Sequence, residues 1–320
     1  MSIPSARPAG ESVIGEREVV AGVLLMLLAA TLQPMQDAIM KYLGGAVPAV
    51  QVAWARMVFQ MLFTLPFVLI GPGIAGLLPR PYGLQILRGL FIGCTNVAFV
   101  SAIIVMPLAD AIALVFVAPL VVTALSALVL GETVGPRRWT AVVIGLAGAV
   151  IIIRPGSGLF GLVALLPITA AISYACYLIV TRRLKTSAPA ISTHFFTAVV
   201  SAVAISIPLA IGMVTGLPLI TPVAPSPGEW GLLAVVGLIS TVSHFLIILA
   251  YNRAPASTLA PMTYFEIVGA TILGYLVFGD FPDFWTWVGV AVIVSSGLYV
   301  VFRARRKQAQ VPISGTDAGL

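Results

Sequence analysis

Apolar residues form long unbroken runs along this chain, and short segments rich in glycine, proline or charge separate them. Runs such as 21–30 and 142–153 are apolar throughout and lack the period-two alternation of membrane β-strands, so each predicts a helix. A hydrocarbon core about 30 Å thick needs roughly 20 apolar residues per helix. On this basis the sequence predicts ten membrane spans, near 19–40, 48–70, 83–104, 109–130, 138–154, 159–181, 190–212, 230–251, 255–278 and 285–302.

Composition supports a membrane protein with many spans. Hydrophobic residues make up 60% and charged residues 9% of the 320 positions, which does not fit a water-soluble domain with an ordinary surface. The first 18 residues lack the apolar core of a signal peptide and are expected to form a short tail. Cys94 and Cys176 both lie in apolar runs, so neither a disulfide framework nor a metal site is expected. No cofactor motif is found.

The basic residues indicate how the spans are oriented. If the amino terminus is cytoplasmic, fourteen basic residues face inward and only Lys41 and Arg154 face outward, while Arg56 lies within a span. The inward set is Arg7, Arg17, Arg80, Arg88, Arg137, Arg138, Arg182, Arg183, Lys185, Arg253, Arg303, Arg305, Arg306 and Lys307. This bias predicts that both termini are cytoplasmic. The net charge of +6 is therefore mainly a topology signal, and no nucleic-acid partner is expected.

The two halves of the chain resemble one another. At an offset of 148 positions, Pro107 aligns with Pro255, Gly131 with Gly279 and Trp139 with Trp287. Such self-similarity indicates a duplication. Because each copy holds an odd number of spans, the second copy must enter the membrane from the opposite side. The predicted architecture is all-α, with ten transmembrane helices in two inverted five-helix repeats, a plan typical of secondary transporters.

This organisation divides the chain into four parts. They are a cytoplasmic tail at 1–18, a first repeat at 19–156, a second and inverted repeat at 157–303, and a cytoplasmic tail at 304–320. The basic cluster at 303–307 either flanks the last span or also contacts anionic membrane lipid. The oligomeric state is left open, with a homodimer among the expectations.

Several motifs resemble those of EamA-type transporters of the drug/metabolite transporter superfamily. They are the runs 130–132 (Leu-Gly-Glu) and 278–280 (Phe-Gly-Asp) that close the fourth and ninth spans, the run 106–111 that opens the fourth, and Asn96 in the third. The resemblance covers about residues 19–303. It implies a bacterial inner-membrane carrier of a small molecule.

A narrower resemblance lies in the first two spans. Asp37, Lys41, Pro48, Gln51 and Arg56 are spaced as in the branch that includes uptake carriers for S-adenosylmethionine and riboflavin. This implies uptake of a metabolite or vitamin. Export of amino acids or toxic metabolites is the alternative.

Few ionisable residues lie inside the predicted spans, and such residues usually face a partner or a wet cavity. They are Asp37, Arg56, Asp110, His244 and Glu266. Glu266 lies near the middle of the ninth span beside Tyr264 and aligns with Ala118 in the first copy. It either binds cargo or a proton, or is satisfied by a neighbouring helix.

The other ionisable residues each leave two interpretations open. Asp37 and Arg56 lie on neighbouring spans and either neutralise one another or contact cargo. Asp110 either contributes to the site or caps the start of its helix. His244 either relays protons beside a carboxylate or bonds a neighbouring helix.

Three classes of function can be compared. A secondary carrier explains the inverted repeat and the central acid. An enzyme would need a nucleophile, base or metal cluster, and the two histidines are about 50 positions apart in sequence with no cysteine beside either. A non-transporting assembly subunit would need neither the duplication nor Glu266.

Overall fold

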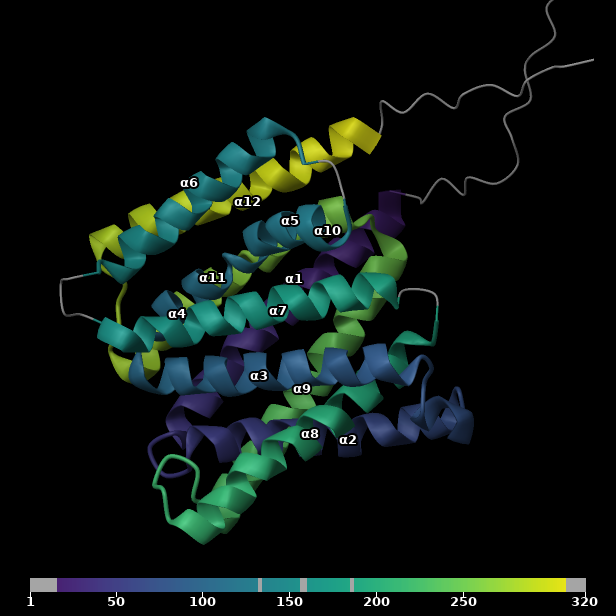
Figure 1. The fold of residues 1–320 in the computed structure, drawn as a ribbon, viewed down its shortest axis with the longest axis vertical. Coiled ribbons are helices and arrows are strands. Elements are labelled where there is room, and N and C mark those ends of the chain that lie inside the picture. Colours follow the sequence, from purple (N-terminus) through teal and green to yellow (C-terminus); the bar gives the residue numbers. More distant parts are fainter. Residues whose placement is uncertain (1–15, 132–133, 156–159, 185–186, 309–320) are drawn as a thin grey trace, which may run out of the picture.

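The structure is a computed structural model that describes residues 16–131, 134–155, 160–184 and 187–308 (Figure 1). Every regular element in this described part is a helix. The elements are α1 (Glu16–Leu43), α2 (Ala49–Ile70), η1 (Ile74–Leu77), α3 (Tyr82–Val105), α4 (Leu108–Val115), α5 (Ala118–Val129), α6 (Pro136–Ile153), η2 (Gly161–Ala164), α7 (Leu165–Arg183), α8 (Ala190–Thr215), α9 (Pro227–Arg253), α10 (Ala256–Thr263), α11 (Phe265–Phe278) and α12 (Phe284–Gln308).

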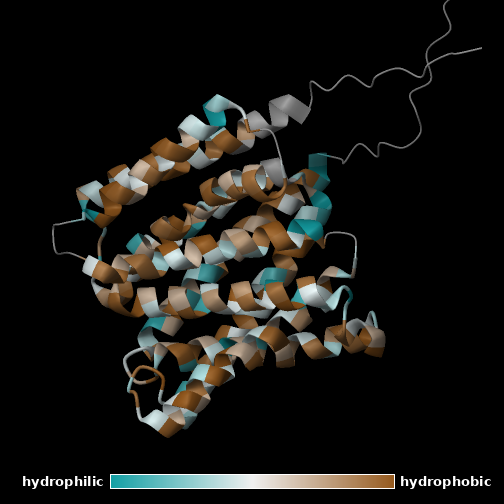
Figure 2. Cartoon of the chain, viewed as in Figure 1, coloured by the Kyte–Doolittle hydropathy of each residue, from teal (hydrophilic) through white to brown (hydrophobic). Residues whose placement is uncertain are grey.

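The predicted spans agree with these helices. Within the described residues, nine segments are long and apolar enough to cross a membrane, and the helix Phe284–Val300 is a shorter apolar tenth. Large apolar side chains such as Leu24, Val143, Val203 and Leu276 lie on the outer surface of the bundle, as expected of residues that face lipid. Figure 2 shows apolar residues dominating the helices. The all-α, multi-span fold class is confirmed.

The fourth and ninth spans differ from the expectation, because each is two helices and not one. The fourth breaks between α4 and α5, and the ninth breaks at Tyr264 between α10 and α11. Pro119 lies in the first turn of α5 and has no N–H for the preceding turn, and Pro261 lies inside α10. Both breaks are crossed by tighter i to i−3 bonds, Val117 to Leu114 and Tyr264 to Pro261. The breaks fall at equivalent positions of the two halves.

The main helix contacts stay the same when each helix is replaced by its counterpart in the other half of the chain. α1 packs on α9, and correspondingly α7, the main helix of the sixth span, packs on α3. α2 packs on both α8 and α9, while α3 packs on α8. α6 and α12 pair with one another at one edge of the bundle, the top of Figure 1. The inverted relation of the halves remains a prediction, which this packing supports.

Glycines let α6 and α12 approach closely at that edge of the bundle. A Cβ added at Gly289 of α12 would lie 2.7 Å from the carbonyl oxygen of Gly148 in α6, and one added at Gly148 would lie 3.0 Å from that of Gly289. Small residues are what bring membrane helices together, because they let the backbones approach. The two halves are thus joined tightly along α6 and α12.

Candidate functional site

Glu266 lies at the start of a helix inside the bundle. It is in the first turn of α11, directly after the break at Tyr264, where unpaired backbone amides and the helix dipole favour a carboxylate. Its Oε2 accepts a hydrogen bond of 2.9 Å from Gln33 Nε2 on α1. At about 1.5 Å per residue, Glu266 is about 18 Å from the end of α11, which places it well inside the membrane-spanning part.

Arg56 is held by polar side chains from two other helices. Its Nη1 donates to Asn96 Oδ1 on α3 at 2.7 Å, and its Nε donates to Ser240 Oγ on α9 at 3.3 Å. Asn96 is oriented in turn, because its Nδ2 donates to the carbonyl of Ala53 at 3.0 Å. Ser240 donates to Gln60 Oε1 at 2.7 Å. Four of these groups lie on α2 and α3, and Ser240 brings in the second half of the chain.

Asp37 and Arg56 do not form a direct ion pair in the described part of the chain. Asp37 is 4% exposed, and Gln36 Nε2 lies 3.5 Å from its Oδ1. Asp37, Arg56 and Glu266 are nevertheless close enough for each charge to act on the other two. The structure therefore brings together four of the residues that the sequence selected, Asp37, Arg56, Asn96 and Glu266.

Tyr264 marks the place where the two broken spans cross. Its ring packs on Phe116, with centroids 4.9 Å apart, and Phe116 is the residue at the equivalent break in the first half. The Tyr264 hydroxyl faces Gly297 of α12, where an added Cβ would clash with it. Tyr264 thus links both broken spans to α12, next to Glu266 in the chain.

His244 is not beside a carboxylate, so the arrangement expected for a proton relay is absent from the described residues. Its ring stacks on that of His194 from α8, with centroids 3.7 Å apart and planes at 16°. The side-chain charges that act on this pair are those of Arg88 and Arg56. His194 Nε2 is buried without a hydrogen-bond partner. Histidines far apart in sequence therefore meet between α8 and α9, which sequence spacing did not predict.

Asp110 does not cap its helix, contrary to one of the two expectations. It lies in the first turn of α4, but Pro107 is the cap residue and no side-chain cap bond forms there. Asp110 is 4% exposed, and its Oδ1 has no hydrogen-bond partner. Its charge interacts with those of Arg154, Asp280 and Asp283 and not with the Glu266 group. Asp110 therefore belongs to a different cluster, at one end of the bundle.

That second cluster fixes the loop between α11 and α12 to the first half of the chain. Lys41 Nζ pairs with Asp280 at 2.7 Å, donates to the Met106 carbonyl at 2.7 Å and lies 4.9 Å from the centre of the Phe278 ring. Arg154 pairs with Asp283 at 2.6 Å. We call these two ion pairs the loop clamp. They use both basic residues that the sequence placed on the outer side.

The pKa of Asp283, which lies outside the spans, is set by opposing effects. Partial burial would raise the pKa of Asp283, but hydrogen bonds from Thr286 and Arg154 outweigh it, and the pKa lies below the usual aspartate value. The backbone amide of Thr286 donates to Asp283 Oδ1 at 2.8 Å, which caps the start of α12. Asp283 stays ionised at neutral pH, so its pair with Arg154 persists there.

Arg88 was assigned to the cytoplasmic segments, and the structure corrects this. It lies within α3 and is 4% exposed. Its Nε donates to Thr181 at 2.8 Å, its Nη1 to the Thr193 carbonyl at 3.0 Å and to Thr197, and its Nη2 to Tyr177 at 2.7 Å. Arg88 therefore joins α3 to α7 and α8. Its position inside the predicted span 83–104 was the available signal.

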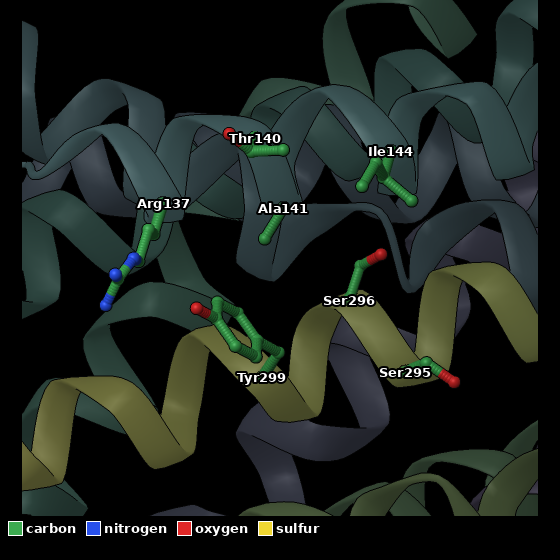
Figure 3. A pocket seen from close by; sticks show the side chains of 7 residues that line it. All are labelled: Arg137, Thr140, Ala141, Ile144, Ser295, Ser296 and Tyr299. Atoms are coloured by element: carbon green, nitrogen blue, oxygen red, sulfur yellow. The ribbon is translucent and has the colours of Figure 1, made fainter.

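Neither of two hollows at the surface of the described part of the chain is lined by the residues around Glu266. One pocket of about 310 Å³ lies between α6 and α12 and is lined by Arg137, Thr140, Ala141, Ile144, Ser295, Ser296 and Tyr299 (Figure 3). Among the described residues, no group of three or more His, Cys, Asp or Glu side chains is arranged to hold a metal ion. Glu132, which the family resemblance rested on, lies outside the described residues.

Comparison with known proteins identifies the family. The model of the EamA-like transporter family matches residues 20–154 and again residues 161–303. A solved crystal structure superposes with a TM-score of 0.60 over 91% of this chain and 99% of its own, at 19% sequence identity. At that identity the structural likeness shows the fold alone.

Three similar proteins have names that describe transport. The S-adenosylmethionine uptake transporter of Rickettsia prowazekii is 28% identical over 90% of this chain and 95% of its own length. The riboflavin transporter of Rhizobium johnstonii is 28% identical over 90% and 93%. The pseudopaline exporter CntI of Pseudomonas aeruginosa is 26% identical over 86% and 93%. With two matches to the family model and a bundle of membrane-length helices, this chain belongs to the EamA-like transporter family and is a multi-pass membrane transporter.

Proposed function

We propose that this transporter is a secondary carrier that imports a small organic metabolite across the bacterial inner membrane, with S-adenosylmethionine or riboflavin as its cargo class. Both termini would be cytoplasmic, and two inverted repeats, 19–156 and 157–303, would open the central site alternately to each side. Support for uptake comes from the relative named as an S-adenosylmethionine uptake transporter, and a relative named as a riboflavin transporter supports the second cargo. Both alignments cover about nine-tenths of this chain.

One observation carries the proposal: Asp37, Arg56 and Glu266 come together inside the bundle from both halves of the chain. Ionisable groups in a membrane are costly, by about 2.5–3.5 kcal/mol at a helix centre on insertion scales, so three in one place favour a cargo site. Asn96 and Ser240 hold Arg56, and Gln33 holds Glu266, which orients the charged groups in advance.

Export is the second candidate, because a relative of nearly full coverage is named as an exporter. Direction is tested in intact cells that express the protein and lack other transport of the labelled cargo. We expect such cells to accumulate labelled S-adenosylmethionine or riboflavin from the medium. Faster loss of label from preloaded cells, without accumulation, would assign export instead.

Transport itself is tested in proteoliposomes. Vesicles loaded with unlabelled S-adenosylmethionine or riboflavin should take up the same cargo in labelled form faster than protein-free vesicles do, because a carrier exchanges solute without a net driving force. A parallel set of vesicles holding heat-inactivated protein controls for leakage. If neither cargo exchanges, the proposed cargo class is wrong.

A further inference from the structure

Two arginines lie inside the bundle, and their hydrogen bonding differs. Arg88 uses four of the five N–H groups of a guanidinium for Tyr177, Thr181, Thr193 and Thr197. Arg56 uses only two of those five, for Asn96 and Ser240, and its Nη2 makes no bond to any residue that the structure describes. The protein occupies nearly all the donors of Arg88, whereas Arg56 keeps donors for another molecule.

Two acids inside the bundle act on the charge of Arg56. Asp37 and Glu266 both act on the Arg56 charge, but neither forms an ion pair with it in the described part of the chain. The protein meets only part of the hydrogen-bonding capacity of the acids, with Gln33 on one oxygen of Glu266 and Gln36 at 3.5 Å from Asp37. Two carboxylates and one guanidinium sum to one net negative charge, and a cation bound between the acids would favour the ionised form of both.

Depth along the helices separates Glu266 from Arg56 and Asp37. At about 1.5 Å per residue, Arg56 is about 10 Å from the start of α2 and Asp37 about 9 Å from the end of α1, while Glu266 is about 18 Å from the end of α11. The ends of α1 and α11 meet at the Lys41–Asp280 pair. Glu266 therefore lies deeper than Arg56, so a bound molecule can meet a cation and a carboxylate at different points along its length.

We infer that the cargo is an organic cation of net charge +1 that also carries one anionic group. The anionic group takes the free Arg56 donors, and the cationic groups face Glu266 and Asp37. Such a cargo leaves the site neutral, which matters because an uncompensated charge in a membrane interior is costly. The inference rests on the proposed function and narrows its cargo.

The two cargo classes named among the relatives differ in this property. S-adenosylmethionine carries a carboxylate, an ammonium and a sulfonium group, so it has net charge +1 with one anionic group. Riboflavin is uncharged at neutral pH and offers neither a cationic group to the two acids nor an anionic group to Arg56. The charges therefore favour the S-adenosylmethionine class.

Competition in the proteoliposome exchange assay tests the inference. The probes are S-adenosylmethionine, its decarboxylated analogue, S-adenosylhomocysteine, which lacks the sulfonium charge, and riboflavin. We expect S-adenosylmethionine to compete best, both altered analogues to be weaker by about tenfold or more, and riboflavin not to compete, because a site built around charged partners discriminates strongly against a ligand that lacks them.

The outcomes separate this inference from the proposed function. Exchange of riboflavin with no effect of S-adenosylmethionine would leave the carrier function intact and overturn the inference. Equal competition by S-adenosylmethionine and its decarboxylated analogue would overturn the role of the anionic group. Failure of both labelled cargoes to exchange would overturn the proposed cargo class and the inference with it.

A pair of arginine variants assigns the anionic contact. Arg56→Gln should bring the competition ratio of S-adenosylmethionine to its decarboxylated analogue close to one, and Arg56→Lys, which keeps the charge, should restore part of it. Arg88→Gln is the matched control and should lower thermal stability while the ratio stays as in the parent. An unchanged ratio in both Arg56 variants would show that Arg56 does not bind the anionic group.

Discussion

For Glu266, the duplication of the chain allows a role in the cargo site to be distinguished from a role in folding. The equivalent position in the first half is Ala118, which starts α5 directly after the same break. A methyl group therefore suffices for the fold at this point. The acid is present in only one copy although it is costly in a membrane, so its role in the cargo site explains it better than a role in folding.

We predict that Glu266→Gln lowers transport by about tenfold or more, which corresponds to about 1.4 kcal/mol of lost interaction, with little change in thermal stability. Glutamine keeps the shape and can still bond Gln33, but it cannot balance a cationic group. Initial exchange rates and unfolding midpoints measure the two effects. Glu229→Gln is the control, because Glu229 belongs to the exposed capping box of α9, where glutamine serves as well.

Normal exchange by Glu266→Gln over a range of pH would remove Glu266 from the site, and so would a loss of exchange that only reflects failure to fold. If transport is coupled to protons, exchange should be less affected than gradient-driven uptake, since exchange need not move the proton.

The sequence predicted which charged residues matter better than it predicted their partners. Asp37, Arg56 and Glu266 stood out because each interrupts an apolar run. Gln33 and Glu266 are 233 positions apart, and only the packing of α1 on α11 brings them together. The histidine pair was missed for the same reason. Arg88 could have been found, because it lies six residues inside a helix that the sequence had already predicted.

At the scale of helices, the apolar runs predicted every span to within a few residues but not the two breaks. Span length follows from the thickness of the hydrocarbon core, so it can be read from the sequence. The fourth run continues through Phe116 without a polar residue, and next to Tyr264 only Thr263 and Glu266 are polar, so hydropathy does not detect the change of backbone. Pro119 and Pro261 were the available signals.

The loop clamp leads to a prediction about two neighbouring aspartates. Asp280→Asn should destabilise the protein by about 1–3 kcal/mol, because Lys41 is largely buried and would lose its charged partner. Asp283→Asn should cost less, about 0–1 kcal/mol, because Asp283 is half exposed and asparagine still caps α12. Thermal unfolding in detergent gives both values.

Salt and a charge exchange provide the controls for this comparison. The Asp283→Asn effect should shrink at high ionic strength, where exposed pairs are screened. Lys41→Asp combined with Asp280→Lys should recover part of the stability that either change alone removes. An Asp283→Asn variant less stable than Asp280→Asn would show that burial does not rank the two ion pairs.

At the scale of the whole molecule, the pairing of helices supports two exchangeable halves, and the charge bias supports one orientation. Because Arg88 lies inside the bundle and not in a cytoplasmic segment, thirteen basic residues, and not fourteen, are left on the cytoplasmic side. Two lie on the other side. The bias remains strong. Both basic residues of the minority side also have a structural role, since Lys41 and Arg154 form the loop clamp. Their placement therefore does not weaken the orientation signal.

The orientation can be tested with single cysteines in a background in which Cys94 and Cys176 are replaced by alanine. Gly135 suits the cytoplasmic side, since it precedes α6, has φ −69° and has open space where a Cβ would lie. Ala224 suits the outer side, since it is exposed in the loop before α9. Ser226 is less suitable, because its hydroxyl caps α9.

We predict that an impermeant thiol reagent labels Ala224→Cys in intact cells and labels Gly135→Cys only after the membrane is permeabilised. The reason is that Gly135 is followed at once by Arg137 and Arg138, whereas the loop that holds Ala224, 216–226, has no basic residue. Labelling after permeabilisation shows that each cysteine is reactive, so protection in intact cells reports the side of the membrane. The reverse pattern would invert the molecule, and the loop clamp would then face the cytoplasm.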